Sequence, residues 1–207
     1  MHIETITPPA IEPVSLEEAF THLRIDPGFT SDDTADADAV ETMIIAARED
    51  AEHYTKRAFV QQTVLMTMND TAAPWAAVEL PRPPLIEVQS VEYYDADNTL
   101  QTVDPALYYT VAGFVPKLVF TSDFTKPAVY ARDDAIRVNY LAGYAPLVSG
   151  TSESEAIDYT ANVPRVVKAA ILIGVQLQFD ELSPEKRAAL ERARDALLEP
   201  LRIHTLA

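Results

Sequence analysis

The chain has 207 residues, 48% of them hydrophobic, which suffices for one large domain or two small ones with a packed core. Its 32 acidic and 16 basic residues give a formal net charge of -16. This excess argues against tight wrapping of nucleic acid, which depends on Lys and Arg neutralising phosphates. The chain contains no cysteine, which excludes disulfides, zinc–thiolate sites and cysteine nucleophiles.

The N-terminal segment is expected to be extended, because Pro8, Pro9 and Pro13 disfavour a helix. It lacks a basic stretch followed by an apolar run, so we expect no secretory signal. The most apolar stretch further along the chain, VVKAAILIGVQLQF, is too short to span a bilayer and contains Lys168. We therefore expect a soluble protein of the cytosol.

Two helices are predicted after this segment. Ser15 begins the first, with Glu18 at the spacing of a capping box, and the sequence DPGF ends it. The second runs from about Asp36 to Lys56, and both its acidic start and the basic pair Lys56–Arg57 at its end suit the helix dipole. Its apolar residues recur at helical spacing on one side: Val40, Met43, Ile44, Ala47, Ala51 and Tyr54.

From Val60 to about Tyr144 the spacing of the apolar residues changes from helical to alternating. The sequence VLMTM alternates, and IEVQSVEYYD alternates until its phase shifts near Ser90, as at a β-bulge. Prolines and turn sequences such as DADN punctuate this region. We expect about six or seven short strands joined by close turns, and therefore antiparallel pairing.

The polar stretch LVSGTSESEAIDYTANV is predicted to be a loop, with two helices after it. Pro164 begins the first of these helices, which is apolar nearly all round and needs cover on nearly every side. A small domain rarely supplies that much cover, so a neighbouring subunit is expected to help. Ser183 and Pro184 begin the last helix and Pro200 ends it. Charged residues surround its apolar stripe: Leu190, Ala193, Leu197 and Leu198.

The order helices, strands, helices predicts an α+β fold. We expect residues 1–59 and 147–207 to form one helical body of about four helices with a short tail. Residues 60–146 are expected to form an inserted antiparallel β unit. The sequence shows no internal repeat and no low-complexity tract.

The sequence offers few residues for catalysis or for cofactor binding. No nucleophile elbow and no glycine-rich phosphate loop occurs. The four histidines do not pair at metal-ligand spacing: His2, His22, His53 and His204. An acidic cluster lacks the ligand order of a calcium loop and is better interpreted as a solvated helix start: Asp32, Asp33, Asp36, Asp38 and Glu41. We expect no enzyme activity, no cofactor and no bound metal.

Aromatic side chains leave a second interpretation open. Trp75 and several tyrosines could stack on sugars or bases, although tyrosines in strands are more often ordinary sheet residues: Tyr93, Tyr94, Tyr108, Tyr109 and Tyr144. A carbohydrate- or cell-surface-binding β module is therefore kept as an alternative to a structural protein.

Sequence phrases spread over nearly the whole chain carry a family resemblance. PPAIEPVSLEEAFTHLRID and DDTADADAVETMIIAAREDAEHYTKRAFVQQT come first, and LPRPPLIEVQSVEYYDADNT and IRVNYLAGYA follow. VPRVVKAAILIGVQLQF and LLEPLRI complete the series. In this order they resemble the head–tail connector proteins of tailed phages. These are also called adaptor or head-completion proteins, and relatives occur in prophages and gene transfer agents. One departure is visible: many members carry a tyrosine and an arginine where this chain has Phe179, Asp180 and Glu181.

The resemblance implies a structural protein of a virion or virus-like particle. Connector subunits of this family form a ring beneath the capsid portal, usually a dodecamer, which extends the DNA channel and provides a platform for neck or tail attachment. The implied partners are further copies of the chain, the portal protein, a downstream neck or tail protein and passing DNA without sequence-specific binding. No membrane partner is expected. The implied location is the particle neck, after assembly in the bacterial cytoplasm. Another neck ring protein, of the stopper or tail-terminator kind, is the alternative.

Candidate contact residues follow from a ring built through faces of the second, third and fourth helices. A closed ring needs heterologous contacts, in which one face meets a different face of the neighbour. The subunit-interface candidates are Arg48, Glu52, Arg57, Arg165, Lys168, Ile171 and Val175. For the charged ones, exposed ion pairs within one chain are the alternative.

The C-terminal tail is the candidate for portal docking, because it is short, apolar at alternate positions and follows Pro200. Its candidate residues are Leu201, Arg202, Ile203 and Leu206. The alternative is that the tail packs back on its own helices.

Overall fold

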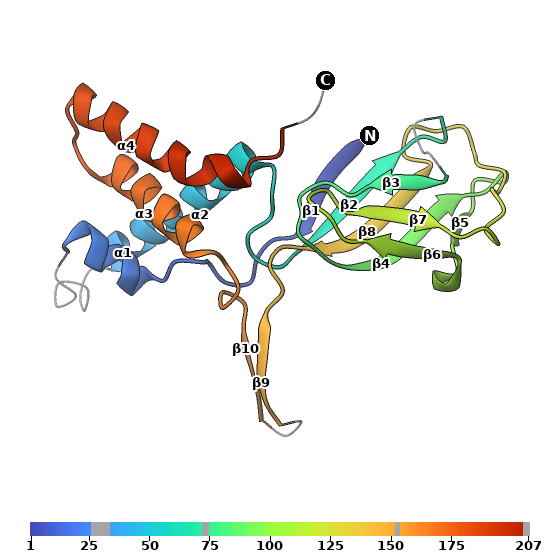
Figure 1. Ribbon diagram of the computed structural model, residues 1–207, viewed down its shortest axis with the longest axis horizontal. Coiled ribbons are helices and arrows are strands. Elements are labelled where there is room, and N and C mark those ends of the chain that lie inside the picture. Colours follow the sequence, from blue (N-terminus) through green and yellow to red (C-terminus); the bar gives the residue numbers. More distant parts are fainter. Residues whose placement is uncertain (26–33, 72–74, 152–153, 205–207) are drawn as a thin grey trace. The chain divides into compact units, whose positions relative to one another are not determined.

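The computed structural model describes residues 1–25, 34–71, 75–151 and 154–204, and the chain divides into two compact units (Figure 1). The β unit comprises Met1–Ala10 and Gln61–Ala145, and the helical unit comprises Ile11–Val60 and Pro146–Ala207. The predicted α+β fold, with antiparallel sheets inserted between N- and C-terminal helices, is confirmed. The first ten residues, which we had grouped with the helices, belong to the β unit because their strand pairs with a strand of the larger sheet.

The larger sheet of the β unit has five antiparallel strands in the order β1-β2-β8-β4-β5. Their bounds are β1 His2–Thr7, β2 Gln62–Met68, β8 Ile136–Ala142, β4 Leu85–Tyr94 and β5 Leu100–Thr102. The pairing of β4 with β8 shifts register between Val88 and Ser90, which confirms the expected change of phase near Ser90. Polar side chains cross the same pair of strands, where Asn139 donates to Ser90 and Arg137 lies 3.8 Å from Glu92.

The second sheet of the β unit has three antiparallel strands in the order β3-β7-β6. Their bounds are β3 Ala77–Glu79, β7 Lys117–Phe120 and β6 Tyr108–Val111, with a 3-10 turn, η2, at Pro105–Leu107. Alternate residues of both sheets are buried and form the core of this unit: Val64, Met66, Met68, Val78, Val91, Leu118, Phe120, Val138 and Tyr140. The alternation expected over this region is therefore what builds the core.

The first two helices of the helical unit show the predicted start of the first and the predicted end of the second, whereas the sequence DPGF, expected to end the first helix, lies outside the described residues. The helix α1 (Leu16–Leu23) starts with a complete capping box, because the Ser15 hydroxyl accepts from the backbone N–H of Glu18 and the Glu18 carboxylate accepts from that of Ser15. The helix α2 (Thr34–Thr55) ends where Lys56 takes a left-handed backbone conformation, with φ 57°.

The helix α3 (Arg165–Phe179) is the centre of the helical unit, and α1, α2 and α4 (Pro184–Leu198) pack against it. A 3-10 turn, η3 (Glu199–Leu201), follows α4. The inner face of α3 is buried: Val167, Ala170, Ile171, Gly174, Val175 and Leu177. Near its two ends Val166 is 42% and Phe179 43% exposed, so the helices of one unit cover part of α3 but not all of it. Among the described residues, no helix combines the length and apolarity that a membrane span requires.

The stretch predicted to be a polar loop contains a β-hairpin, so that prediction was wrong. The strands β9 (Leu147–Thr151) and β10 (Ser154–Asp158) pair antiparallel, and Val148 lies opposite Ile157. In Figure 1 the hairpin projects away from the helices. Its many Ser and Glu residues concealed the short alternating pattern, because a two-stranded ribbon buries too little to require an apolar face.

Candidate functional site

The described residues show no arrangement suited to metal binding. Within residues 1–25, 34–71, 75–151 and 154–204, no three His, Cys, Asp or Glu side chains are placed to hold a metal ion. The four histidines are exposed, and His204 lies 3.3 Å from the carboxylate of Glu199. Of the acidic cluster, Asp32 and Asp33 lie outside the described residues, as does the side chain of Asp36.

Trp75, the centre of the carbohydrate-binding alternative, is used in packing. Its ring stacks on Phe124 at a centroid distance of 5.3 Å and lies 5.4 Å from Phe120. Its indole N–H donates to Asp70 at 2.7 Å, and Lys126 lies 2.9 Å from the same carboxylate. These contacts place the indole in an aromatic cluster with Phe120 and Phe124.

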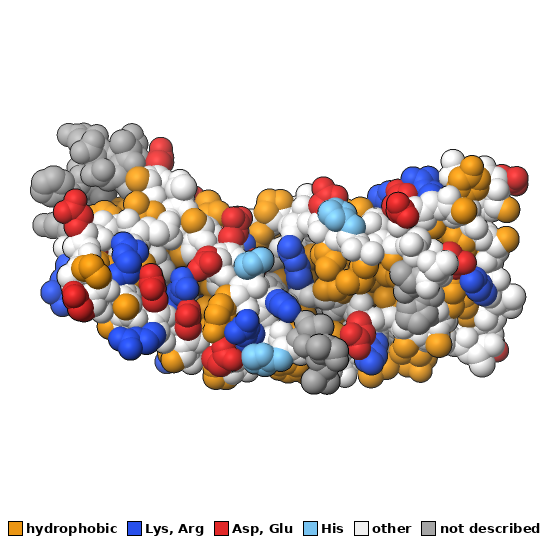
Figure 2. Space-filling model, turned by 90° about the horizontal axis from the view of Figure 1, so that it is seen from above, with side chains coloured by type: hydrophobic (Ala, Val, Ile, Leu, Met, Phe, Trp, Pro, Cys, Tyr) orange, Lys and Arg blue, Asp and Glu red, His pale blue; other side chains and the backbone are white. Residues whose placement is uncertain are grey.

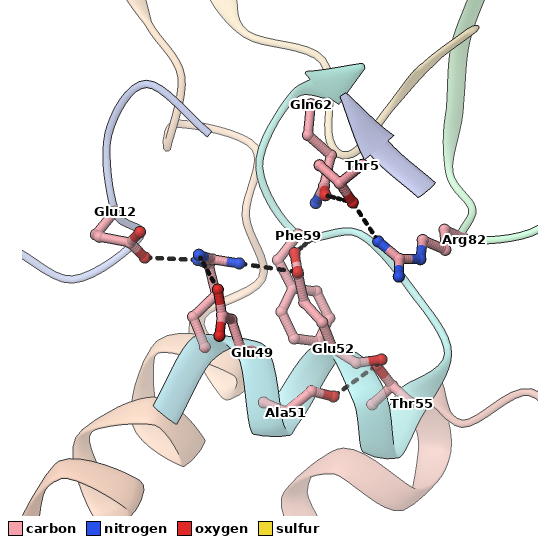
Figure 3. Close-up of polar contacts among 10 residues, drawn as sticks. Thr5, Glu12, Glu49, Ala51, Glu52, Thr55, Phe59, Gln62 and Arg82 are labelled. Carbon is pink, nitrogen blue, oxygen red and sulfur yellow. Dashed lines mark hydrogen bonds and ion pairs between the residues drawn. The ribbon is translucent and has the colours of Figure 1, made fainter. Parts of the chain in front are cut away.

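Arg48 pairs with three carboxylates of the helical unit. Figure 3 labels these partners, Glu12, Glu49 and Glu52. Arg48 is 4% exposed, and its guanidinium contacts Glu12 at 2.7 Å, Glu52 at 3.0 Å and Glu49 at 3.5 Å. Burial acts to lower the pKa of Arg48, but the three carboxylates outweigh it, so that its pKa lies above the usual value. The second carboxylate oxygen of Glu52 accepts from the backbone N–H of Phe59 at 2.7 Å.

This cluster joins three segments of the same unit. Glu12 precedes α1, Arg48 and Glu52 lie on α2, and Phe59 follows α2. Arg48 and Glu52, which we predicted as interface candidates, are thus paired with each other inside one unit. A buried cation with several carboxylate partners is costly to break, so the cluster fixes how the chain enters α1 and leaves α2.

Arg57 and the start of the C-terminal tail are bonded to each other. The Nε–H of Arg57 donates to the carbonyl of Leu201, and the backbone N–H of Ile203 donates to the carbonyl of Thr55 at 3.0 Å. The guanidinium of Arg202 lies 4.8 Å from the centre of the Tyr54 ring. Residues 201–203 therefore pack on the C-terminal end of α2, which was the alternative to a free tail. Leu206 lies outside the described residues.

A surface hydrogen bond extends this contact. The Tyr54 hydroxyl donates to Glu199 at 2.6 Å. That bond is the main cause that lowers the pKa of the Glu199 carboxyl and raises the pKa of Tyr54. The turn η3 is thereby attached to α2 by charge as well as by packing.

The candidates on α3 separate into two groups. Arg165 is exposed and Lys168 half-buried, and both lie in the first turn of the helix. Ile171 and Val175 are fully buried against the other helices of their unit. Helical spacing identified them as apolar but could not show which side of α3 its own unit covers. The exposed large apolar residues of α3 are instead Val166 in its first turn and Phe179 at its last position.

Shallow hollows follow α1 and α3 on the surface of the helical unit. One is lined by Glu17, Glu18, Thr21, His22 and Leu172, and the next by His22, Leu23, Arg24, Gln176, Asp180 and Lys186. Their lining mixes both signs of charge with no converging catalytic groups.

No protein-family model and no curated protein matches the chain. Solved structures match over its whole length, and the following three alignments each cover 100% of this chain and 98% of the matched chain.

The first matched chain is in the neck of an empty gene transfer agent (GTA) particle computed with C6 symmetry, with a TM-score of 0.76 and 19% identity. The second is in the virion of a native GTA particle, with values of 0.74 and 18%. The third is in the neck of a native GTA particle computed with C12 symmetry, with values of 0.68 and 16%. At such identities the similarity concerns the fold. Over its full length, then, this chain has the fold of chains found in the necks of gene transfer agent particles.

Proposed function

We propose that this chain is a structural subunit of the neck of a tailed-phage-like particle, a gene transfer agent or its phage relatives, and that it acts as the head–tail connector beneath the portal. The observation that carries the proposal is the full-length match of fold, in which 98% of a neck chain is covered at a TM-score of 0.76. A match confined to one unit would support only a shared module. Here the match extends through the β unit and all four helices.

A ring of identical copies is the arrangement that this role requires. The similar chains come from necks computed with C6 and C12 symmetry, and a dodecamer is compatible with both. Within such a ring the partners are further copies, the portal and the next neck or tail component. The net charge of -16 would keep passing DNA from adhering to the channel wall.

The position of the ring in the particle is tested by reconstruction of particles that carry this chain, together with affinity purification of the full-length protein. We expect density for the chain directly under the portal and copurification of the portal protein. Copurification with the tail tube in the absence of portal would contradict the connector role. It would instead favour a stopper or tail terminator, which occupies the same neck.

The C-terminal tail is proposed to contact the portal. The hydrogen bonds of the tail determine which deletion tests this proposal. Deleting residues 201–207 would remove the hydrogen bonds of Leu201 and Ile203 with α2, so a loss of binding could reflect misfolding. Deleting residues 204–207 removes Leu206 and keeps both bonds. We expect that variant to remain folded by circular dichroism and to lose portal binding. Undiminished binding would show that the tail is not the docking segment.

A further inference from the structure

Six strands have a free edge within the described part of the chain. They are β1 and β5 of the larger sheet, β3 and β6 of the second sheet, and β9 and β10 of the hairpin. A free edge presents unpaired backbone N–H and C=O groups with which another strand can pair. Proteins protect such edges with charged side chains or by keeping the strand very short. An edge that lacks both protections is therefore a candidate interface.

Four of these six edges are protected. The strands β1, β3 and β10 contain the carboxylates Glu4, Glu79 and Asp158, and β5 has three residues. In contrast, β6 has four residues and β9 has five, and neither contains a charged residue. Pairing with another strand at β6 or β9 would therefore take no charged side chain of these strands out of water.

The side chains around β6 favour an added strand. Tyr109 is 53% and Val111 44% exposed. Tyr109 lies opposite Val119 of β7, and Val119 lies opposite Ala77 of β3. A row of apolar residues thus crosses one face of this sheet and ends at the β6 edge. In strand addition, the backbone bonds form at such an edge and the alternate side chains of the incoming strand pack on the face beside it.

The hairpin of β9 and β10 lacks the third strand that would stabilise it. The two strands pair with each other, and no further strand of the described residues joins them (Figure 1). A two-stranded ribbon is marginally stable in water, and a third strand is one way to stabilise it. Leu147 is 53% and Val148 54% exposed in β9, and Ile157, which lies opposite Val148, is 46% exposed. The free edge of β9 thus offers apolar side chains on both faces of the ribbon.

Exposed apolar area alone does not select these two strands. Figure 2 shows hydrophobic side chains in several patches on the visible face, with charged side chains between the patches. Scattered exposed apolar side chains are normal on protein surfaces. The combination of a free edge, no charged residue and exposed apolar side chains is what distinguishes β6 and β9.

We propose that β9 of each copy pairs with β6 of the next copy and so adds its hairpin to the β3-β7-β6 sheet of that copy. This inference deepens the proposed function and rests on it for the assumption that copies assemble side by side. The two edges are different surfaces of one chain, so the contact is heterologous and repeats around a ring. Pairing over four residues spans about 14 Å and buries less than the roughly 800 Å² per partner of a stable interface, so isolated copies associate weakly.

The absence of cysteine from the sequence permits a cross-linking test without background. Thr110 of β6 and Ser149 of β9 are both exposed. Full-length Thr110→Cys and Ser149→Cys are treated with a short bismaleimide at high protein concentration, separately and as a mixture. We expect each variant alone to remain monomeric on denaturing gels and the mixture to give dimers. Dimers from Thr110→Cys alone in equal yield would indicate that β6 pairs with β6, and would overturn the proposal.

The double variant Thr110→Cys/Ser149→Cys distinguishes contacts between copies from contacts within one copy. At high concentration we expect a ladder of higher oligomers. If the double variant cross-links within single chains at high dilution while the mixture of single variants gives no dimers, the hairpin pairs with β6 of its own chain. That result overturns the proposal.

A matched control sets the level of random collision. Ser149→Cys mixed with Thr102→Cys places a thiol on an exposed threonine of another free edge, that of β5. A yield from Ser149→Cys with Thr110→Cys no higher than this control overturns the proposal. Circular dichroism of every variant verifies that the fold is intact.

A charge on the edge tests whether strand pairing holds the contact. Adding Tyr109→Lys to Thr110→Cys is expected to lower the dimer yield with Ser149→Cys by about tenfold, because a lysine on a free edge opposes strand addition. Adding Leu100→Lys instead, at a β5 side chain that is 45% exposed, is expected to leave the yield unchanged. Equal yields for the two lysine variants would show that β6 is not the pairing edge.

The outcomes separate this contact from the proposed function. Cross-links between positions 110 and 149 of a protein that does not occupy the neck support the contact and refute the neck role. A ring beneath the portal in which Thr110→Cys cross-links to another particle protein, and not to position 149 of a copy, supports the role and refutes the contact.

Discussion

Charged residues of this chain have two distinct uses at the scale of single side chains. Arg48 is buried and organises three carboxylates of the helical unit, whereas Asp70 lies near the surface of the β unit and accepts from Lys126 and Trp75. The bond from Lys126 is the largest cause that lowers the pKa of Asp70 below its ordinary value of 3.8, and the bond from Trp75 adds to it. The hydrogen bonds that Asp70 accepts from Lys126 and Trp75 are therefore expected to depend on pH.

Protonation of Asp70 is expected to be visible in the fluorescence of Trp75, the only tryptophan in the chain. Because the pKa of Asp70 is lower in the folded than in the unfolded chain, the stability from its hydrogen bonds is fully present above pH 3.8. That stability is lost as the pH falls through the lower, folded pKa. We expect a fluorescence transition with its midpoint below 3.8 that Asp70→Asn removes and Glu87→Gln keeps. A transition that persists in Asp70→Asn would assign it to another group.

At the scale of elements, the packing of α2 on α3 depends on the smallest possible residue at their crossing. A Cβ atom at Gly174 would lie 2.9 Å from the Cβ of Ala47, closer than two carbons pack. Alanine is the better helix former by about 1 kcal/mol, so helix propensity alone favours Gly174→Ala. The close approach of the two helices opposes that preference.

Gly174→Ala is therefore expected to lower the free energy of unfolding by about 1–3 kcal/mol, as overpacking of a close contact does. Urea unfolding followed by circular dichroism at the helical band measures it. Adding Ala47→Gly relieves the contact and is expected to recover part of the loss, although it introduces a second glycine into a helix. An increase in stability for Gly174→Ala alone would mean that the two helices separate at no cost.

At the scale of the whole molecule, the chain has two cores, each built from segments distant in sequence. The β unit takes its edge strand β1 from the N-terminus, and the helical unit takes α1 and α2 from one part of the chain and α3 and α4 from another. Each unit also has its own spectroscopic reporter. Trp75 lies in the β unit, and the four long helices lie in the other.

Removal of residues 2–10 is expected to destabilise the β unit selectively, because β1 is an edge strand of the larger sheet and pairs with β2. We expect the unfolding transition followed by Trp75 fluorescence to lose roughly 2–4 kcal/mol, the scale of several backbone hydrogen bonds. The transition followed by helical circular dichroism is expected to remain in place.

The variant Arg48→Met is expected to destabilise the helical unit and to leave the β unit unchanged. It leaves the carboxylates of Glu12 and Glu52 buried without their cation, which costs about 3–5 kcal/mol in the helical unit. The unfolding transition followed by Trp75 fluorescence is expected to remain unchanged in this variant. Equal shifts of both signals in either variant would show that the two units unfold as one.

Local chemistry in the sequence was enough to locate the helix ends and the alternating region. Ser15 and Ser183 accept backbone hydrogen bonds at the predicted helix starts, and Lys56 ends α2 at the predicted joint. The phase change near Ser90 was visible for the same reason. Caps, turns and bulges act over a few residues, so the residues that determine them are adjacent in the sequence.

Only the tertiary structure decided what covers each surface. One partner of Arg48 is Glu12, which lies 36 residues away, and β1 joins a sheet whose other strands begin at Gln62. Periodicity identified Ile171 and Val175 as apolar, but their burial inside one unit depends on where α2 and α4 pack. The sequence by itself therefore determined an α+β chain with few catalytic groups and most of its helices and strands, but not the hairpin of β9 and β10. Which faces remain open for another copy follows from long-range packing, which local spacing does not encode.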